Sequence, residues 1–127
     1  MRYLIDTHIF VWWLNGDKKL KTPIKKILEN KENQIAASVI SGIEISVKAK
    51  TRKIKLKTTI ERMFEISGFK VLEVNLNHVL ELDKLPLHRD HKDPFDRILI
   101  SQSRVEKLTF ITADEKIWKY NLPLLKA

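Results

Sequence analysis

The chain has 127 residues, of which 43% are hydrophobic and 31% charged. This length predicts a single domain, residues 1–127, that removes roughly two thirds of its unfolded surface from water. The absence of cysteine excludes disulfides and thiolate metal sites, and the apolar run at residues 9–14 is far too short to cross a bilayer. We therefore expect a cytoplasmic protein with no membrane segment. The net charge of +8 favours a polyanionic partner.

The first predicted element is a strand over residues 2–6. Residues 3–5 form an apolar run without polar alternation, which is typical of a strand covered on both faces. Asp6 interrupts this run at the carboxyl end of the strand, and ligands of open α/β sheets bind at that end. A short helix follows, with Thr7 as its expected cap, and it ends after Leu14 at an Asn-Gly-Asp turn signal.

Helices and strands alternate along the rest of the chain. Capping residues and prolines mark several helix starts, including Thr22-Pro23, Asp93-Pro94 and a capping-box outline at Thr58–Glu61. The further helices are expected at residues 22–30, 39–51, 58–68, 77–85, 94–106 and, as a short helix, around 117–120, and the further strands at 34–37, 69–74, 108–112 and 122–125. This alternation predicts a three-layer α/β/α fold with a mostly parallel central sheet of about five strands.

Four acidic residues lie at or near the predicted strand ends or early in the helices that follow. Each one alone is explained as a helix cap or a first-turn acid. Because parallel strands share one carboxyl edge, however, all four are expected to converge there. Carboxylates at close range raise one another's pKa unless shared protons, basic partners or a divalent cation compensate them. The four residues are Asp6, Glu44, Asp96 and Asp114.

The expected chemistry of such a cluster is hydrolysis of a phosphodiester. Oxygen ligands without cysteine favour a hard cation such as Mg²⁺ or Mn²⁺. A bound cation of this kind polarises a phosphoryl oxygen and lowers the pKa of a bound water, which becomes the nucleophile. An acidic cluster inside a basic chain therefore indicates a metal site that handles phosphates.

Four segments of the chain also carry a family resemblance. They are Tyr3-Leu4-Ile5-Asp6-Thr7-His8, Ser41-Gly42-Ile43-Glu44-Ile45, His91-Lys92-Asp93-Pro94-Phe95-Asp96-Arg97 and Thr112-Ala113-Asp114. In this order they resemble PIN-domain nucleases, especially the VapC-type toxins of bacterial and archaeal toxin–antitoxin pairs. The similarity extends over nearly the whole chain, and residues 93–97 are its most specific part.

The resemblance implies a metal-dependent endoribonuclease, with all four acids as catalytic residues. Asp6 and Asp96 would be the principal ligands of Mg²⁺ or Mn²⁺, and Asp114 a ligand through water or to a second ion. Glu44 would orient or deprotonate the attacking water. Two further residues are interpreted as supporting ones, Asp93 as a helix cap and Thr112 through its hydroxyl.

A basic segment follows the expected position of Glu44. It contains six lysines and arginines between residues 48 and 57 and no acid. Such runs are commonly solvated, and Lys48 is also spaced for an ordinary helical pair with Glu44. The segment is nevertheless well placed to hold an RNA backbone. The candidate RNA contacts are Lys48, Lys50, Arg52, Lys53, His91 and Arg97.

The same residues leave several alternatives open. His88 and His91 with the two acids of the Asp93-Pro94-Phe95-Asp96 segment also fit a mixed histidine–carboxylate metal site. A non-catalytic RNA-binding module is a second possible function. A phosphatase or phosphoacceptor on a doubly wound sheet is a third, although the usual Asp-x-Asp context is missing around Asp6, where Thr7 and His8 follow.

The resemblance further implies two protein partners. One is a small VapB-type antitoxin whose carboxyl-terminal segment blocks the acidic site, and the other is a second copy of the chain in a homodimer. The adjacent Trp12 and Trp13 point about 100° apart on a helix. We expect one of them in the core and the other on an exposed apolar patch that a partner covers.

Overall fold

The computed structural model describes residues 1–127 and contains one fully parallel sheet. Its strands occur in the order β3-β2-β1-β4-β5. They are β1 (Arg2–Ile5), β2 (Gln34–Ser38), β3 (Lys70–Leu72), β4 (Thr109–Thr112) and β5 (Leu124–Lys126). The predicted strand at the amino terminus thus lies at the centre of the sheet, as its apolar run indicated.

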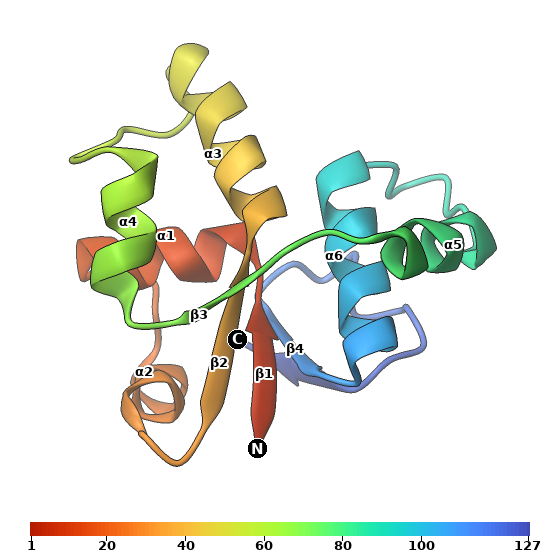
Figure 1. Ribbon diagram of the computed structural model, residues 1–127, viewed down its shortest axis with the longest axis horizontal. Helices are drawn as coiled ribbons and strands as arrows, with labels where there is room; N and C mark the ends of the chain where they lie inside the picture. Colours follow the sequence, from red (N-terminus) through yellow and green to blue (C-terminus); the bar gives the residue numbers. More distant parts are fainter.

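Six helices cover the sheet. They are α1 (Thr7–Asn15), α2 (Thr22–Glu29), α3 (Val39–Lys50), α4 (Ile60–Ser67), α5 (Leu76–Lys84) and α6 (Pro94–Glu106). In Figure 1, α1, α2 and α4 lie on one side of the sheet and α5 and α6 on the other, while α3 rises from the carboxyl end of β2. This arrangement confirms the predicted three-layer α/β/α fold. None of the helices combines the length and the apolar character that a bilayer-spanning helix needs.

Two hydrophobic cores form, one on each face of the sheet. Tyr3 and Ile5 of β1 pack in the first core together with Phe10 of α1. Leu4 points to the opposite face and packs in the second core with Leu99 of α6. The alternating directions of successive strand side chains explain this division, because both faces of β1 are covered. The central strands are therefore held rigidly, and their carboxyl ends are fixed in space.

The edges of the sheet differ from the prediction. The strand predicted at residues 69–74 is shorter, Lys70–Leu72, and β5 begins later than expected, at Leu124. The short helix expected around residues 117–120 is absent, and that segment forms successive turns. In these turns Tyr120 N donates to Ile117 O at 3.0 Å, and both side chains still enter the core because they are three residues apart.

Two helix caps also differ from the prediction. Asp6, not Thr7, caps α1, since its Oδ1 accepts a hydrogen bond from Ile9 N at 2.9 Å. Thr7 becomes the first helical residue. Likewise Thr59 caps α4 by accepting from Arg62 N at 3.1 Å, so the capping box predicted to begin at Thr58 does not form.

Neither tryptophan of α1 is fully buried, which contradicts the expectation that one of them lies in the core. Trp12 and Trp13 are both half-buried and pack along the margin of the first core. The Trp13 ring lies 5.4 Å from the ring of Phe69, between their centroids.

Candidate active site

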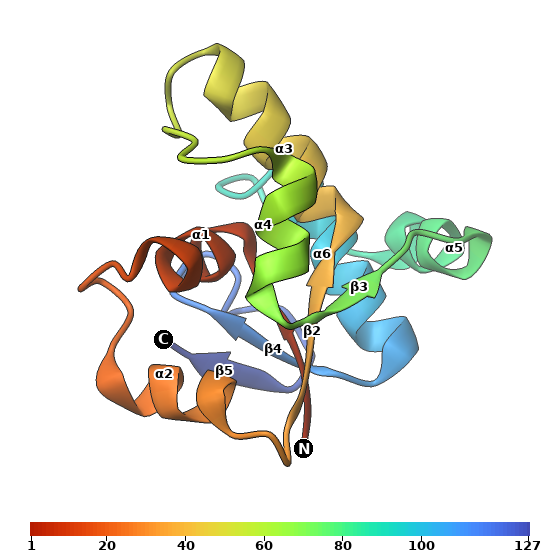
Figure 2. The ribbon, with the colours of Figure 1, turned by 60° about the vertical axis from the view of Figure 1, so that its left-hand side comes forward.

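All four predicted acids lie at the carboxyl edge of the sheet. Asp6 follows β1 directly, and Asp114 lies two residues beyond β4, the neighbouring strand. Glu44 belongs to α3, which continues directly from β2, and Asp96 lies in the first turn of α6. Figures 1 and 2 show this edge at the top of the sheet, with the start of α3 and the amino-terminal end of α6 next to it. Parallel topology therefore gathers residues that are widely separated in the sequence.

Asp6 is buried, with 4% of its surface exposed, and it is held through both carboxylate oxygens. Oδ1 accepts from Ile9 N, and Oδ2 accepts a short hydrogen bond from the Thr112 hydroxyl. Burial raises the pKa of Asp6 above its usual value, the bonds from Thr112 and Ile9 oppose this rise, and the nearby charge of Glu44 adds to it. Ionised Asp6 therefore carries an electrostatic cost that a nearby cation reduces.

The Thr112 hydroxyl links two of the acids. It donates to Asp6 Oδ2 and accepts from the backbone N of Asp114 at 3.0 Å. Asp114 is half-buried, and its Oδ1 accepts from Lys116 N at 3.0 Å. A single buried hydroxyl thus sets the position of the Asp6 carboxylate relative to the turn that carries Asp114.

Glu44 is almost completely enclosed, with 1% of its surface exposed. Its Oε1 accepts from the Thr7 hydroxyl at 2.6 Å, and its Oε2 pairs with the Lys48 ammonium one helical turn later. Burial would lower the pKa of Lys48, but the hydrogen bond to Glu44 and the charges of Glu44, Asp93 and Asp96 outweigh it and raise that pKa. Lys48 is therefore a counter-charge inside the acidic cluster.

Asp96 is half-buried and contacts a histidine. Its Oδ2 lies 2.9 Å from His91 Nε2, while His91 Nδ1 lies 2.9 Å from the Tyr120 hydroxyl. The pKa of Asp96 is raised to about 6, mainly by burial. The charges of Asp93 and Glu44 add to this rise, and the bond with His91 opposes it. Asp93 itself caps α6 by accepting from Phe95 N at 2.9 Å and from Asp96 N at 3.2 Å.

The donor set fits a hard divalent cation. One ligand atom from each of His91, Asp96 and Asp114 lies within 4.8 Å of the others, and Thr112 ties the buried Asp6 to the same place. Burial raises the pKa values of Asp6 and Asp96, and the nearby charge of Glu44 raises both further, so their ionised forms lack compensating positive charge. Positive charge among these oxygens would remove that penalty.

The candidate RNA contacts divide into two groups. Lys50, Arg52 and Lys53 are exposed at the end of α3 and in the loop that follows. Arg97 is different, because its guanidinium donates to the backbone oxygens of Pro86 at 2.8 Å and Leu85 at 3.3 Å. Lys48, Arg97 and His91 are thus already engaged by protein groups, and their RNA contacts stay a prediction.

Three polar residues of the site escaped the sequence analysis. The Thr7 hydroxyl contacts Ser41 Oγ at 3.0 Å as well as Glu44, and the Tyr120 hydroxyl contacts His91. The sequence did indicate that Thr7 lies near the site, since it directly follows Asp6. Ser41 and Tyr120 had none, because their partners lie 34 and 29 residues away in the chain.

The raised pKa of Asp96 predicts how stability depends on pH without metal. Asp96 has a folded pKa of about 6 against an unfolded value of 3.8, so between these values the folded state binds the proton more tightly. Stability should therefore fall as pH rises from about 4 to about 6, by an amount on the order of 2 kcal/mol. Urea unfolding in EDTA measures this. Asp96→Asn should flatten the profile, and an equal slope in both proteins would contradict the prediction.

The fold is that of the PIN domain. The sequence model of this family matches residues 3–121, so the chain belongs to the PIN domain family. A search of curated protein sequences found no match.

Solved structures similar to this chain come from VapBC complexes. VapBC2 from Rickettsia felis, bound to a DNA fragment from its promoter, gives a TM-score of 0.72 at 22% identity, over 100% of this chain and 99% of that one. A toxin–antitoxin complex from Klebsiella pneumoniae gives 0.66 at 19%, over 98% and 96%. VapBC-1 from nontypeable Haemophilus influenzae gives 0.64 at 16%, over 99% and 98%. At these identities the likeness is one of fold.

Proposed function

We propose that this protein is a metal-dependent endoribonuclease and the toxin of a toxin–antitoxin pair. The observation that carries the proposal is the placement of Asp6, Glu44, Asp96 and Asp114 at the carboxyl edge of the parallel sheet of a PIN fold, where ligand atoms of Asp96 and Asp114 lie within 4.8 Å of each other. The net charge of +8 suits an RNA substrate. Fold similarity to structures of VapBC complexes supports the toxin role, which would be exerted in the cytoplasm.

Each acid has a distinct proposed role. Asp6, Asp96 and Asp114 would hold Mg²⁺ or Mn²⁺, which when bound lowers the pKa of a water and stabilises charge on the phosphoryl group. Glu44 orients the attacking water and accepts its proton. Its two oxygens are fixed by Thr7 and Lys48, so the carboxylate cannot rotate away from the cluster. Asp93 and Thr112 support the site by holding α6 and Asp6 in place.

The exposed basic residues beyond α3 are proposed to bind the RNA backbone. Lys50, Arg52 and Lys53 continue the helix that carries Glu44, so they extend from the acidic edge toward solvent. In Figure 1 this end of α3 projects above the rest of the molecule, followed by the loop to α4. Phosphate contacts there would orient a strand whose scissile bond lies at the acidic edge.

The direct test is cleavage of labelled RNA by purified protein. We expect cleavage with Mg²⁺ or Mn²⁺ and none in EDTA, and the Asp96→Asn variant should be inactive with either metal. Cleavage that persists in EDTA and in the variant would overturn the proposal. RNA binding without cleavage in every condition would favour a non-catalytic binding module. Release of phosphate from an aryl phosphate, with RNA left intact, would favour a phosphatase.

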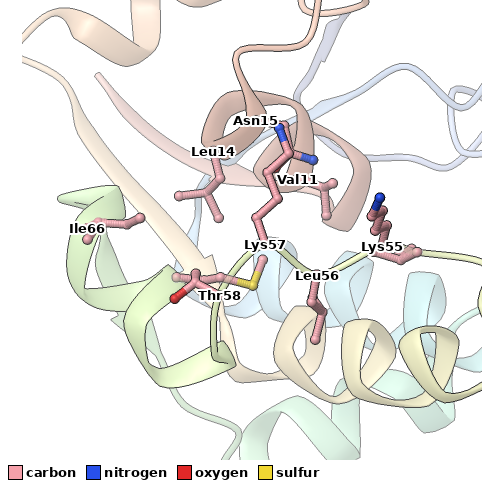
Figure 3. Close-up of a pocket in the computed structure, with 10 residues that line it drawn as sticks. Val11, Leu14, Asn15, Lys55, Leu56, Lys57, Thr58 and Ile66 are labelled. Atoms are coloured by element: carbon pink, nitrogen blue, oxygen red, sulfur yellow. The ribbon is translucent and has the colours of Figure 1, made fainter.

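An apolar pocket supports the proposal of an antitoxin partner. Figure 3 shows Val11 and Leu14 of α1 and Ile66 of α4 around it, with Lys55 and Lys57 on the adjoining loop. Its volume is about 180 Å³. We propose that a VapB-type antitoxin inserts an apolar side chain here and places acidic residues near the lysines. A homodimer would use a different surface, and light scattering measures that state.

A matched pair of variants tests the proposed antitoxin site. Ile66 at the pocket and Val79 on α5 are both 51% exposed, so each tolerates a charge about equally. Ile66→Glu should weaken binding of the proposed VapB-type antitoxin at least about tenfold, since a carboxylate would be desolvated in the apolar contact. Val79→Glu should change the affinity less than about twofold. Calorimetry measures both, and equal affinities in the two variants would contradict this site.

A further inference from the structure

The position of His91 in the site is compatible with two roles, that of a metal ligand and that of a hydrogen-bond donor to Asp96. It comes from the loop before α6, is 3% exposed, and is engaged through both ring nitrogens. Its Nε2 faces Asp96 Oδ2, and one of its ring nitrogens lies within 4.8 Å of ligand atoms of Asp96 and Asp114. Two roles therefore compete. His91 either gives its Nε2 lone pair to a cation or uses an Nε2 hydrogen to hold Asp96.

The hydrogen-bonding partners of His91 decide between these roles. An ionised carboxylate only accepts hydrogen bonds, so the hydrogen of the 2.9 Å contact between His91 Nε2 and Asp96 Oδ2 belongs to Nε2. The other ring nitrogen, Nδ1, then accepts from the Tyr120 hydroxyl, 2.9 Å away. The Arg97 guanidinium carries only donors, and its Nη1 lies 3.5 Å from the Tyr120 hydroxyl oxygen, which is consistent with a Tyr120 hydrogen directed at His91.

The surrounding contacts fix this chain of donors in place. Arg97 is itself anchored on the backbone oxygens of Leu85 and Pro86. The Tyr120 ring packs edge-on against His91, with centroids 5.4 Å apart, and it is 4% exposed. Lys119, the neighbour of Tyr120, also pairs with Asp90, the neighbour of His91. The imidazole therefore has little freedom to rotate.

We propose that His91 is a positioning residue for Asp96 and not a metal ligand. By donating from Nε2 to Oδ2, it fixes the carboxylate plane and leaves the other oxygen, Oδ1, for the cation. Tyr120 selects the His91 tautomer, and Arg97 in turn orients the Tyr120 hydroxyl. This inference rests on the proposed metal-dependent function and refines it, since it reduces the protein ligands to carboxylates. Partners of this kind typically contribute 10- to 100-fold, roughly, to metal affinity.

Nitrogen-15 NMR of the histidine rings tests the tautomer directly. In metal-free protein, His91 should show a protonated Nε2 and an unprotonated Nδ1, and this pattern should persist when Mg²⁺ is added. Tyr120→Phe removes only the hydroxyl and should mix the two tautomers. Loss of the Nε2 hydrogen on addition of Mg²⁺, or an Nδ1-protonated ring at the outset, would overturn the inference.

Mn²⁺ binding without RNA tests the positioning role. The spin-echo spectrum of bound Mn²⁺ should lack imidazole nitrogen coupling, and its presence would overturn the inference. His91→Gln places an amide donor near the Nε2 position and should keep Mn²⁺ affinity within about threefold, whereas His91→Leu should lose roughly 10- to 100-fold. Equal losses in both variants, with both folded by thermal unfolding in EDTA, would indicate a ligand and refute the proposal.

The outcomes also separate this inference from the proposed function. A wild-type protein that binds Mn²⁺ as expected but cleaves no RNA would overturn the nuclease proposal and leave the role of His91 standing. A wild-type protein that binds no Mn²⁺ would overturn both. Cleavage that requires metal, together with nitrogen coupling to bound Mn²⁺, would overturn only the role of His91.

Discussion

Replacing Asp6 by Asn is expected to reduce RNA cleavage at least about 100-fold and to leave the metal-free protein no less stable. The buried carboxylate has a raised pKa, so a neutral amide of the same shape removes an electrostatic cost. Asn retains an oxygen that accepts from Ile9 N, and Thr112 accepts from its amide nitrogen. The expected loss is therefore one of cation affinity and catalysis, not of fold.

Cleavage rates with Mn²⁺ and urea unfolding in EDTA measure the two effects of Asp6→Asn together. Asp83→Asn is the matched control, because Asp83 is an exposed acid on α5 away from the acidic edge. It should leave both quantities unchanged. Growth of cells expressing the wild-type protein should be inhibited, and growth of cells expressing Asp6→Asn should not. A variant that cleaves normally, or that unfolds much more readily than wild type in EDTA, would contradict this account.

Replacing Lys48 by Met is expected to lower stability in EDTA by about 2 kcal/mol. The Lys48 ammonium neutralises Glu44, whose side chain is 2% exposed, and it also faces the charges of Asp93 and Asp96. Its removal leaves a buried carboxylate with the Thr7 hydroxyl as its remaining partner. The loss is smaller than for a fully enclosed pair because the Lys48 side chain is 24% exposed.

Two comparisons isolate the effect of Lys48. Lys50 lies on the same helix but is exposed, so Lys50→Met should change stability by less than about 0.5 kcal/mol. Glu44→Gln in the Lys48→Met background should recover most of the loss, because the carboxylate that Lys48 neutralised is then absent as well. Saturating Mn²⁺ should recover part of it by restoring positive charge to the cluster. Equal losses of unfolding free energy for Lys48→Met and Lys50→Met would refute the role of Lys48 as the counter-charge of Glu44.

Local sequence signals were sufficient for the layers of the fold. The apolar run of residues 3–5 predicts a doubly covered strand, and the capping residues Ser38 and Asp93 begin the helices that follow. From these elements, parallel topology alone brings the carboxyl ends of β1, β2 and β4 to one edge. The gathering of the four acids follows from that geometry, while their catalytic roles stay a prediction.

What the sequence did not predict depends on partners that are distant in the chain. The Thr112 hydroxyl donates to Asp6, which is 106 residues away in the chain, and no local sequence pattern predicts that contact. The helix expected at residues 117–120 was wrong because apolar residues three apart suit successive turns as well as a helix. Thr7 was expected to cap α1, but Asp6 caps it because its carboxylate reaches the backbone N of Ile9. The Thr7 hydroxyl is therefore available to bond Glu44.

The order of strands in the sheet determines when the acidic edge is first assembled during synthesis. β1 is the first strand of the sheet to be made, yet one of its two neighbours, β4 (Thr109–Thr112), is made only after β2 and β3. A nascent chain that has not yet released residue 114 from the ribosome lacks an acid of the cluster and the hydroxyl that holds Asp6. Long-range pairing of this kind forms late. Under the proposed function, the acidic edge therefore becomes competent only once β4 and residue 114 have emerged and β4 has paired with β1.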